Sequence, residues 1–159
     1  LGVLQQALRD LSAWVEKGTE PPASTSYIIR DGQVIVPARA SERKGIQPVI
    51  TCTVNGSESI KIKAGTRVMF RALVEIPQNA GRIVSVKCDF EGSGKFTDAV
   101  KLKKSALNKP VTIVKFRHIF MKPGTYFPSI LVESQREGDS STPFALIRNL
   151  GRVRIVVAD

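Results

Sequence analysis

From residue 46 onward the chain consists of short runs in which apolar and polar residues alternate, each bounded by Gly, Pro, Asn or Asp. A period of two turns one side of every strand toward a core. Many such runs at short spacing are typical of a sandwich. The pattern predicts an all-β antiparallel β-sandwich of about seven strands. The expected strands are Val49–Val54, Ser59–Lys63, Arg67–Ile76, Arg82–Phe90, Val111–Phe120, Thr125–Ser134 and Gly151–Val157, with a short edge strand near Ala99–Lys103.

The same alternation predicts the core of this sandwich. Pro128 interrupts one expected strand, and because proline lacks a backbone donor we expect a bulge or an edge there. The predicted inward side chains are Ile50, Cys52, Val54, Ile60, Ile62, Val68, Phe70, Ala72, Val74, Ile76, Val84, Val86, Cys88, Phe90, Val114, Phe116, His118, Phe120, Tyr126, Pro128, Ile130, Val132, Val153, Ile155 and Val157.

Residues 1–45 have a different pattern. Apolar side chains recur at helical spacing over residues 1–17, and Gly18 with Pro21-Pro22 ends that pattern, which predicts an amphipathic helix. Such a helix cannot bury its apolar side alone, so we expect it to pack on the sandwich or on another domain. Asp31-Gly32 lies between two apolar runs and predicts a β-hairpin over residues 27–36. Residues 38–45 are small and charged and are expected to be linker.

Two segments of the sandwich region resemble the signatures of PKD-type immunoglobulin-like domains. They are Cys88-Asp89-Phe90-Glu91-Gly92-Ser93-Gly94 and His118-Ile119-Phe120-Met121-Lys122-Pro123-Gly124-Thr125-Tyr126. The resemblance implies a non-catalytic accessory module of an extracellular protein, with His118 bonded to nearby loop backbone. A tyrosine corner is expected at Tyr126. The structural motif residues are Asp89, Phe90, Gly92, Gly94, His118, Pro123, Gly124 and Tyr126.

The chain departs from that family's pattern at three positions. Ser93 stands where the family has Asp, Glu91 where it has Gly, and Cys88 where it has Trp. The first two changes argue against a calcium loop built from Asp89, Glu91, Ser93 and Asp98. The third removes an aromatic platform for sugars. We therefore expect no metal and no cofactor.

The run from Ala13 to Ser24, with its Trp-x-Glu-x-Gly pattern and Pro-Pro exit, is similar to the closing segment of tannase- and feruloyl-esterase-like α/β-hydrolases. This resemblance implies that residues 1–22 are the C-terminal helix of an upstream catalytic domain. Residues 23–45 would be a hairpin linker, and 46–159 the PKD-like sandwich. The parent would be a secreted hydrolase, extracellular or periplasmic, whose catalytic triad lies upstream.

Within this chain no catalytic constellation is evident. His118 is the only histidine, and the sequence pattern offers it no nucleophile or carboxylate partner. Asp89 and Glu91 share one short turn, without a sign of a cleft or a raised pKa. We predict that the chain is not itself an enzyme.

The formal net charge is +10, nearly all of it in residues 46–159. A basic surface attracts acidic polysaccharide, nucleic acid or anionic membranes. Aromatic residues are only 6%, which does not favour nucleic acid. No apolar stretch is long enough to span a membrane. Cys52 and Cys88 could be buried thiols or a disulfide.

Two candidate surfaces follow from these patterns. The first is a protein interface that would be covered by the helix, the hairpin or the catalytic domain; it comprises Leu4, Leu8, Leu11, Trp14, Met69, Arg71, Leu73, Lys115 and Arg117. The second is a patch for an anionic ligand: Lys87, Arg152 and Arg154. The leading hypothesis is a non-catalytic accessory domain that packs on the hydrolase and could also aid substrate capture. The alternative is an independent carbohydrate- or anionic-polymer-binding module.

Overall fold

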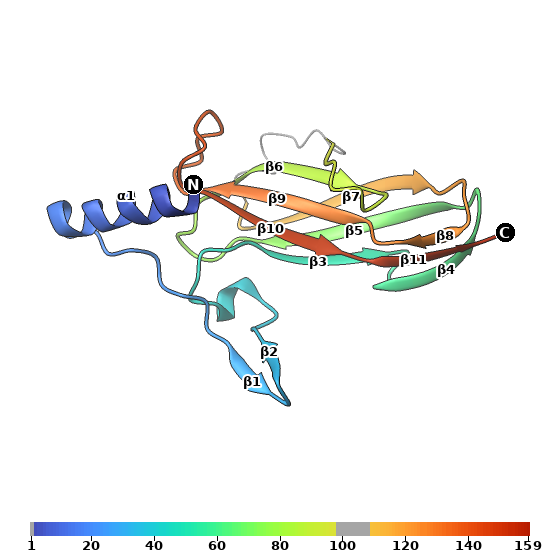
Figure 1. Cartoon of the computed structure of the whole chain (residues 1–159), viewed down its shortest axis with the longest axis horizontal. Helices are drawn as coiled ribbons and strands as arrows, with labels where there is room; N and C mark the ends of the chain where they lie inside the picture. Colours follow the sequence, from blue (N-terminus) through green and yellow to red (C-terminus); the bar gives the residue numbers. More distant parts are fainter. Residues whose placement is uncertain (1, 98–108) are drawn as a thin grey trace.

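The computed structural model describes residues 2–97 and 109–159. A helix and a hairpin precede a set of longer strands (Figure 1). The expected edge strand near Ala99–Lys103 lies outside the described residues. The elements are α1 (Gly2–Lys17), β1 (Ile28–Arg30), β2 (Gln33–Ile35), the 3₁₀ turn η1 (Ala40–Glu42), β3 (Val49–Val54), β4 (Ser59–Lys63), β5 (Arg67–Glu75), β6 (Arg82–Asp89), β7 (Val111–Ile119), β8 (Gly124–Tyr126), β9 (Ser129–Gln135), β10 (Leu146–Arg152) and β11 (Arg154–Ala158).

The body of the molecule is a β-sandwich, which confirms the predicted fold class. One sheet has the order β3-β5-β7 and the other β10-β9-β6, and both are antiparallel. A third small sheet, β4-β11-β8, lies at the end away from α1 (Figure 1). Apolar side chains from all three sheets form one core, with Phe70 and Phe116 stacked at 4.9 Å in it. This core is what holds the sheets together.

The chain passes between sheets at Pro128. The expected strand Thr125–Ser134 is in fact β8 and β9, and Gly151–Val157 spans the end of β10 and most of β11. The antiparallel register is the same on both sides of the break, since Ser129 lies opposite Arg152 and Tyr126 opposite Ile155. Pro128 has no N–H to donate, but its carbonyl accepts the Val153 N–H at 3.1 Å. The two strands therefore bend together into the third sheet.

A β-bulge alters the predicted core in β6. The register against β9 shifts between Ile83 and Ser85. Ile83 is consequently buried at 1% exposure, whereas Val84, the predicted core residue, is only half-buried. An extra residue in one strand reverses the alternation beyond it, and the apolar pattern on both sides of Val84 does not reveal this.

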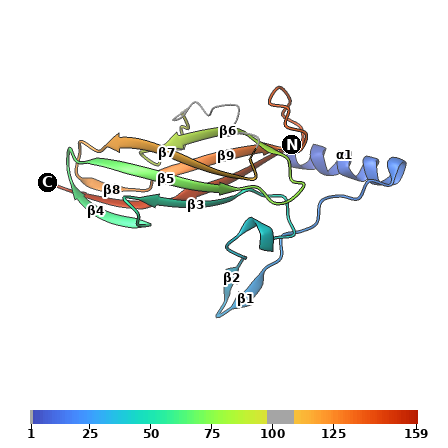
Figure 2. The ribbon, with the colours of Figure 1, turned by 180° about the vertical axis from the view of Figure 1, so that it is seen from behind.

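The predicted helix and hairpin both form. Gly18 has a φ of +67°, and its N–H donates to the Trp14 carbonyl at 3.0 Å, which ends α1 in a left-handed cap. Asp31 and Gly32 both have positive φ, as a two-residue hairpin turn requires. Figure 2 shows α1 and the hairpin at the same end of the sandwich. Among the described helices none is long and apolar enough to cross a membrane.

The segment after the hairpin is attached to the sandwich. Ala40 in η1 is buried, and its N–H donates to a Glu75 carboxylate oxygen at 3.2 Å. Arg43 donates back to the Pro37 carbonyl at 2.6 Å. Residues 38–45, expected to be plain linker, therefore tie the hairpin to the end of β5.

Candidate interaction surfaces

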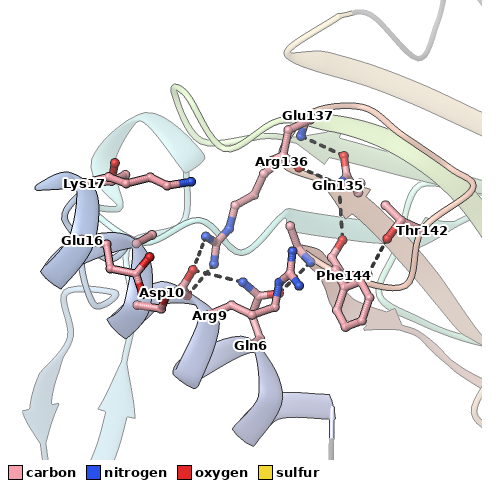
Figure 3. A pocket seen from close by; sticks show the side chains of 14 residues that line it. Gln6, Arg9, Asp10, Glu16, Lys17, Gln135, Arg136, Glu137, Thr142 and Phe144 are labelled. Carbon is pink, nitrogen blue, oxygen red and sulfur yellow. Dashed lines mark hydrogen bonds and ion pairs between the residues drawn. The ribbon is translucent and has the colours of Figure 1, made fainter.

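Helix α1 contacts the sandwich through its polar side (Figure 3). Asp10 forms a two-pronged ion pair with Arg136, with N–O distances of 2.8 and 3.0 Å. The Arg136 guanidinium accordingly lowers the pKa of Asp10, although partial burial opposes the shift. Gln6 accepts the backbone N–H of Ala145 at 2.8 Å. These contacts join α1 to the loop between β9 and β10.

That loop is organised by one buried side chain. Gln135 at the end of β9 is only 2% exposed. Its Oε1 accepts the N–H groups of Glu137 and Asp139, both at 2.8 Å, and its Nε2 donates to the Phe144 carbonyl at 3.3 Å. The buried Gln135 amide is fully hydrogen-bonded, so it fixes the conformation of the loop. The loop in turn places Arg136 opposite α1.

A cavity of about 590 Å³ lies between α1 and this loop (Figure 3). Its charged side chains are of both signs, and the Arg9 guanidinium lies 4.5 Å from the centre of the Phe144 ring. Asp10 and Arg136 form an ion pair across it. The cavity is therefore the polar seam between helix and loop.

The apolar side of α1 is left in solvent. Leu4, Leu8, Leu11 and Trp14 are all at least 51% exposed. These are the helix residues of the interface predicted from the sequence, and no described part of the chain covers them. Neighbouring exposed apolar side chains of this kind are common at interaction sites.

The hairpin presents a second apolar surface at the same end of the molecule. Tyr27, Ile28, Ile29 and Val34 are more than half exposed. A shallow apolar pocket of about 330 Å³ lies between the two strands and η1, lined by Tyr27, Ile28, Ile35, Val36, Pro37 and Glu42 among others.

The outer face of β3-β5-β7 carries the rest of the predicted interface. Arg71 lies directly opposite Lys115, Met69 opposite Arg117, and Leu73 opposite Ile113. The sequence suggested that α1 or the hairpin could cover this face, but α1 bonds instead to the loop after β9, and Ile113 remains 49% exposed. The polar contacts of α1 with the loop after β9 fix where the helix lies. The spacing of its apolar residues in the sequence does not predict these contacts.

The predicted anionic-ligand patch is divided in the structure. Lys87 pairs with Glu133 at 3.4 Å, and Arg148 binds the other oxygen of the same carboxylate at 2.7 Å. Burial raises the pKa of Glu133. Hydrogen bonds from Arg148 and Ser85 and the charge of Lys87 lower it by more, so the pKa is lower than usual. Arg152 at the end of β10 and Arg154 in β11 are exposed but belong to different sheets.

Asp89 organises the turn that follows β6. Its carboxylate accepts the N–H groups of Glu91, Gly92 and Gly94 at 3.2, 2.9 and 2.6 Å, and the Ser93 hydroxyl at 3.3 Å. Burial raises the pKa of Asp89, but the backbone donors outweigh it and the pKa is lowered. Gly92 and Gly94 both have positive φ, which glycine adopts without strain.

His118 is held by aromatic rings. It stacks on Phe90 with centroids 4.1 Å apart and meets Phe120 edge-on at 4.6 Å. The hydrogen bond to loop backbone implied by the family resemblance is absent among the described residues. Desolvation lowers the pKa of His118, and the nearby charge of Glu91 only partly offsets this. The imidazole is therefore a neutral ring that packs at the edge of the core.

Tyr126 forms the corner contact that the sequence predicts. Its hydroxyl donates to the carbonyl of Lys122, four residues upstream, at 3.0 Å. The Tyr126 ring also packs on Phe120 at 4.7 Å. Gly124, in the Pro-Gly turn, has a φ of +155° and lies against the same ring. The contacts made by His118 and Tyr126 serve the fold.

Cys52 and Cys88 are buried and unbridged. Burial raises the pKa of each thiol to about 12, which leaves both protonated and unreactive. Within residues 2–97 and 109–159, no three His, Cys, Asp or Glu side chains are arranged to hold a metal ion.

The acid–base pairs described above were not predicted from the sequence: Asp10 and Arg136 are 126 positions apart, and only the fold brings them together.

No protein-family model matches the chain, and no curated protein is similar to it in sequence. Solved structures that match the chain include the PKD domain of an M14-like peptidase from a Thermoplasmatales archaeon, at 15% identity and a TM-score of 0.44, covering 71% of this chain and 94% of that one. A CARDB domain from Pyrococcus furiosus is 13% identical, with a TM-score of 0.45 and coverages of 71% and 97%. A Niemann-Pick type C2 protein from the Japanese carpenter ant is 8% identical, with a TM-score of 0.36 and coverages of 68% and 89%.

Proposed function

We propose that this chain is a non-catalytic accessory domain that docks on a neighbouring domain of the same polypeptide through the apolar side of α1 and the β1-β2 hairpin. The observation that supports this most directly is the orientation of α1. The helix is bonded to the sandwich by Asp10 and Gln6 on its polar side, so its leucines point away from the domain's own core.

The energetics favour a partner for these surfaces. Burying one leucine fully is worth about 1.5–3 kcal/mol, and Leu4, Leu8 and Leu11 gain little of this in the isolated chain. The hairpin adds exposed Ile28, Ile29 and Val34 at the same end (Figure 2). A domain placed against this end would bury both sets at once.

The hydrolase identity of that neighbour is part of the proposal. It rests on the segment from Ala13 to Ser24, which is similar to the end of tannase- and feruloyl-esterase-like hydrolases. The chemistry would then be carried out by the neighbour, in an extracellular or periplasmic enzyme. The sandwich would stabilise that enzyme and help to capture its substrate.

The test uses the complete polypeptide from which this chain comes. Leu8→Glu should lower its melting temperature and its activity on aryl esters, because the charge would enter the proposed interface. Leu150→Glu is the matched control, since Leu150 is 55% exposed on β10 and outside the interface. Equal effects of both substitutions would overturn the docking. Absence of a serine nucleophile elbow upstream would overturn the hydrolase assignment alone.

A second candidate function is binding of an anionic carbohydrate or other polymer. The net charge of +10 favours it. The patch that includes Lys87 supports it less, because Glu133 neutralises that lysine. Polymer binding should be abolished by salt, whereas apolar docking through α1 should persist.

A further inference from the structure

A continuous surface of cations and aliphatic side chains covers the outer side of β5 and β7. We name it the basic face. Figure 2 shows this sheet from behind the view of Figure 1, with α1 and the hairpin at one end of it. The basic face consists of Arg67, Met69, Arg71 and Leu73 on β5, and Ile113, Lys115, Arg117 and Ile119 on β7.

The cations of the basic face are adjacent because of the strand register. Arg71 lies directly opposite Lys115, and Arg117 lies opposite Met69, one step along the same side. Paired positions on neighbouring strands are about 5 Å apart and diagonal ones about 7–8 Å. Like charges placed directly opposite destabilise a sheet, so this arrangement costs the isolated fold free energy.

Nothing in the described part of the chain neutralises these cations. The ion pairs of Lys87, Arg136 and Arg148 all lie outside this face. On the same side of β5 the one carboxylate is that of Glu75, which lies four residues from Arg71, or about 13 Å along the strand. Glu75 also accepts the Ala40 N–H. On the opposite sheet, by contrast, Glu133 serves two cations.

Aliphatic side chains lie beside the cations on the same face. Leu73 and Ile113 form an apolar pair beside the pair Arg71–Lys115, and Ile119 lies opposite Arg67 beyond it. Ile113 and Ile119 are 49% and 37% exposed. No aromatic side chain stands among the eight residues, so the face offers no stacking platform for a sugar ring or a base.

We propose that the basic face docks an acidic protein surface in which apolar side chains lie between the carboxylates. Charge complementarity selects an acidic partner. Leu73, Ile113 and Ile119 favour a protein over a polysaccharide as the partner. A hydrated polyanion would cover these side chains without the free-energy gain that burial against apolar groups provides. The proposal uses different residues from the α1 and hairpin surface and does not depend on the function proposed above.

The test is a titration of the full 159-residue chain with two synthetic peptides of equal length and equal glutamate content. Leucine fills the remaining positions in one peptide and serine in the other. Heparin serves as a third probe. We expect the Glu-Leu peptide to bind several-fold more tightly than the Glu-Ser peptide at the same ionic strength, because only the former buries Leu73 and Ile113.

Two variants locate the binding. Arg71→Glu with Arg117→Glu should weaken the Glu-Leu peptide by roughly tenfold or more, since attraction becomes repulsion. Arg152→Glu with Arg154→Glu makes the same change in net charge away from the basic face and should have little effect. Ile113→Ser should reduce the preference for the Glu-Leu peptide and leave the Glu-Ser peptide unchanged.

Three results would overturn the proposal. Binding of heparin in preference to both peptides would make the face a polysaccharide surface. Equal losses in the two double variants would reduce the effect to net charge. Absence of peptide binding at low salt would leave the face without an acidic protein partner. Because α1 is intact in all these variants, none of the results bears on its docking.

Discussion

Gly151 shows how closely β10 approaches β3. A methyl group at this position would lie 2.5 Å from Ile50 Cγ2 and 2.6 Å from Cys52 Sγ, inside contact distance. Both neighbours belong to the packed interior between the two large sheets, so neither can move freely.

We therefore predict that Gly151→Ala destabilises the fold by about 1–3 kcal/mol, the usual cost of overpacking. Urea unfolding followed by circular dichroism of the strands would measure it. Adding Cys52→Ala should recover part of the loss by removing the sulfur. If the double variant is no better than the sum of the two single ones, the close approach is not the cause.

His118 predicts a pH dependence of stability. Desolvation lowers its pKa in the folded chain below the ordinary value of 6.5. As pH falls, the unfolded chain therefore binds a proton at His118 before the folded chain does. The free energy of unfolding is highest above pH 6.5 and decreases as pH falls from 6.5 through the folded-state pKa of His118. The lowered pKa values of Asp10, Asp89 and Glu133 act at lower pH.

The measurement is the free energy of unfolding at several values between pH 7.5 and 5. We expect it to decrease with acidification in the native chain. His118→Phe retains the stacking on Phe90 but cannot titrate, so its unfolding free energy should be flat over this window. Because the chain has one histidine, a slope that persists in the variant would contradict the assignment.

At the scale of elements, α1 depends on a polar attachment. Among the described residues, the Asp10–Arg136 pair and the Gln6–Ala145 bond join it to the sandwich, and the two charged side chains are only 20% and 23% exposed. A helix of this length has little stability of its own in water, so the attachment should also determine how well it is formed.

We predict that Asp10→Asn loosens α1 without unfolding the sandwich. Amide hydrogen exchange over Gly2–Lys17 should accelerate by about fivefold, which corresponds to about 1 kcal/mol for a partly buried pair. The unfolding midpoint of the sandwich should not change. Ser12→Ala removes a bond to Glu16 within the exposed helix and serves as the control. Equal exchange rates in the native chain and in Asp10→Asn would show that the ion pair does not hold the helix.

The bent strand pairs β8–β9 and β10–β11 are a feature of the fold that the sequence pattern does not predict. The apolar alternation continues across Pro128 and across Val153, so each pair looks like one strand. The register also continues. Only the missing donor of Pro128 indicates a break, and it does not say that the chain would pass into another sheet.

At the scale of the whole molecule, the two ends of the sandwich differ. One end is closed by the small sheet β4-β11-β8, whose strands complete the core. The other end carries α1 and the hairpin, where most of the strongly exposed apolar side chains collect. The basic face lies along the side between them. The molecule thus has a stabilised end and two surfaces suited to partners.

The sequence by itself determined the fold class, the helix, the hairpin turn and most of the core. These depend on local rules: a period of two for strands, a period near 3.6 for the helix, and positive φ at Gly18 and Gly32. The Tyr126 corner could be predicted for the same reason, because its partner Lys122 is only four residues away.

The tertiary structure alone decided which charges meet. Glu133 neutralises Lys87 across neighbouring strands, and Arg136 holds Asp10 from a distant loop, whereas Arg71 and Lys115 are placed side by side without an acid. Strand register sets such pairings, and a register depends on bulges and sheet order that involve the whole chain. For the same reason the sequence could not show that Glu133 pairs with Lys87, a member of the predicted anionic-ligand patch.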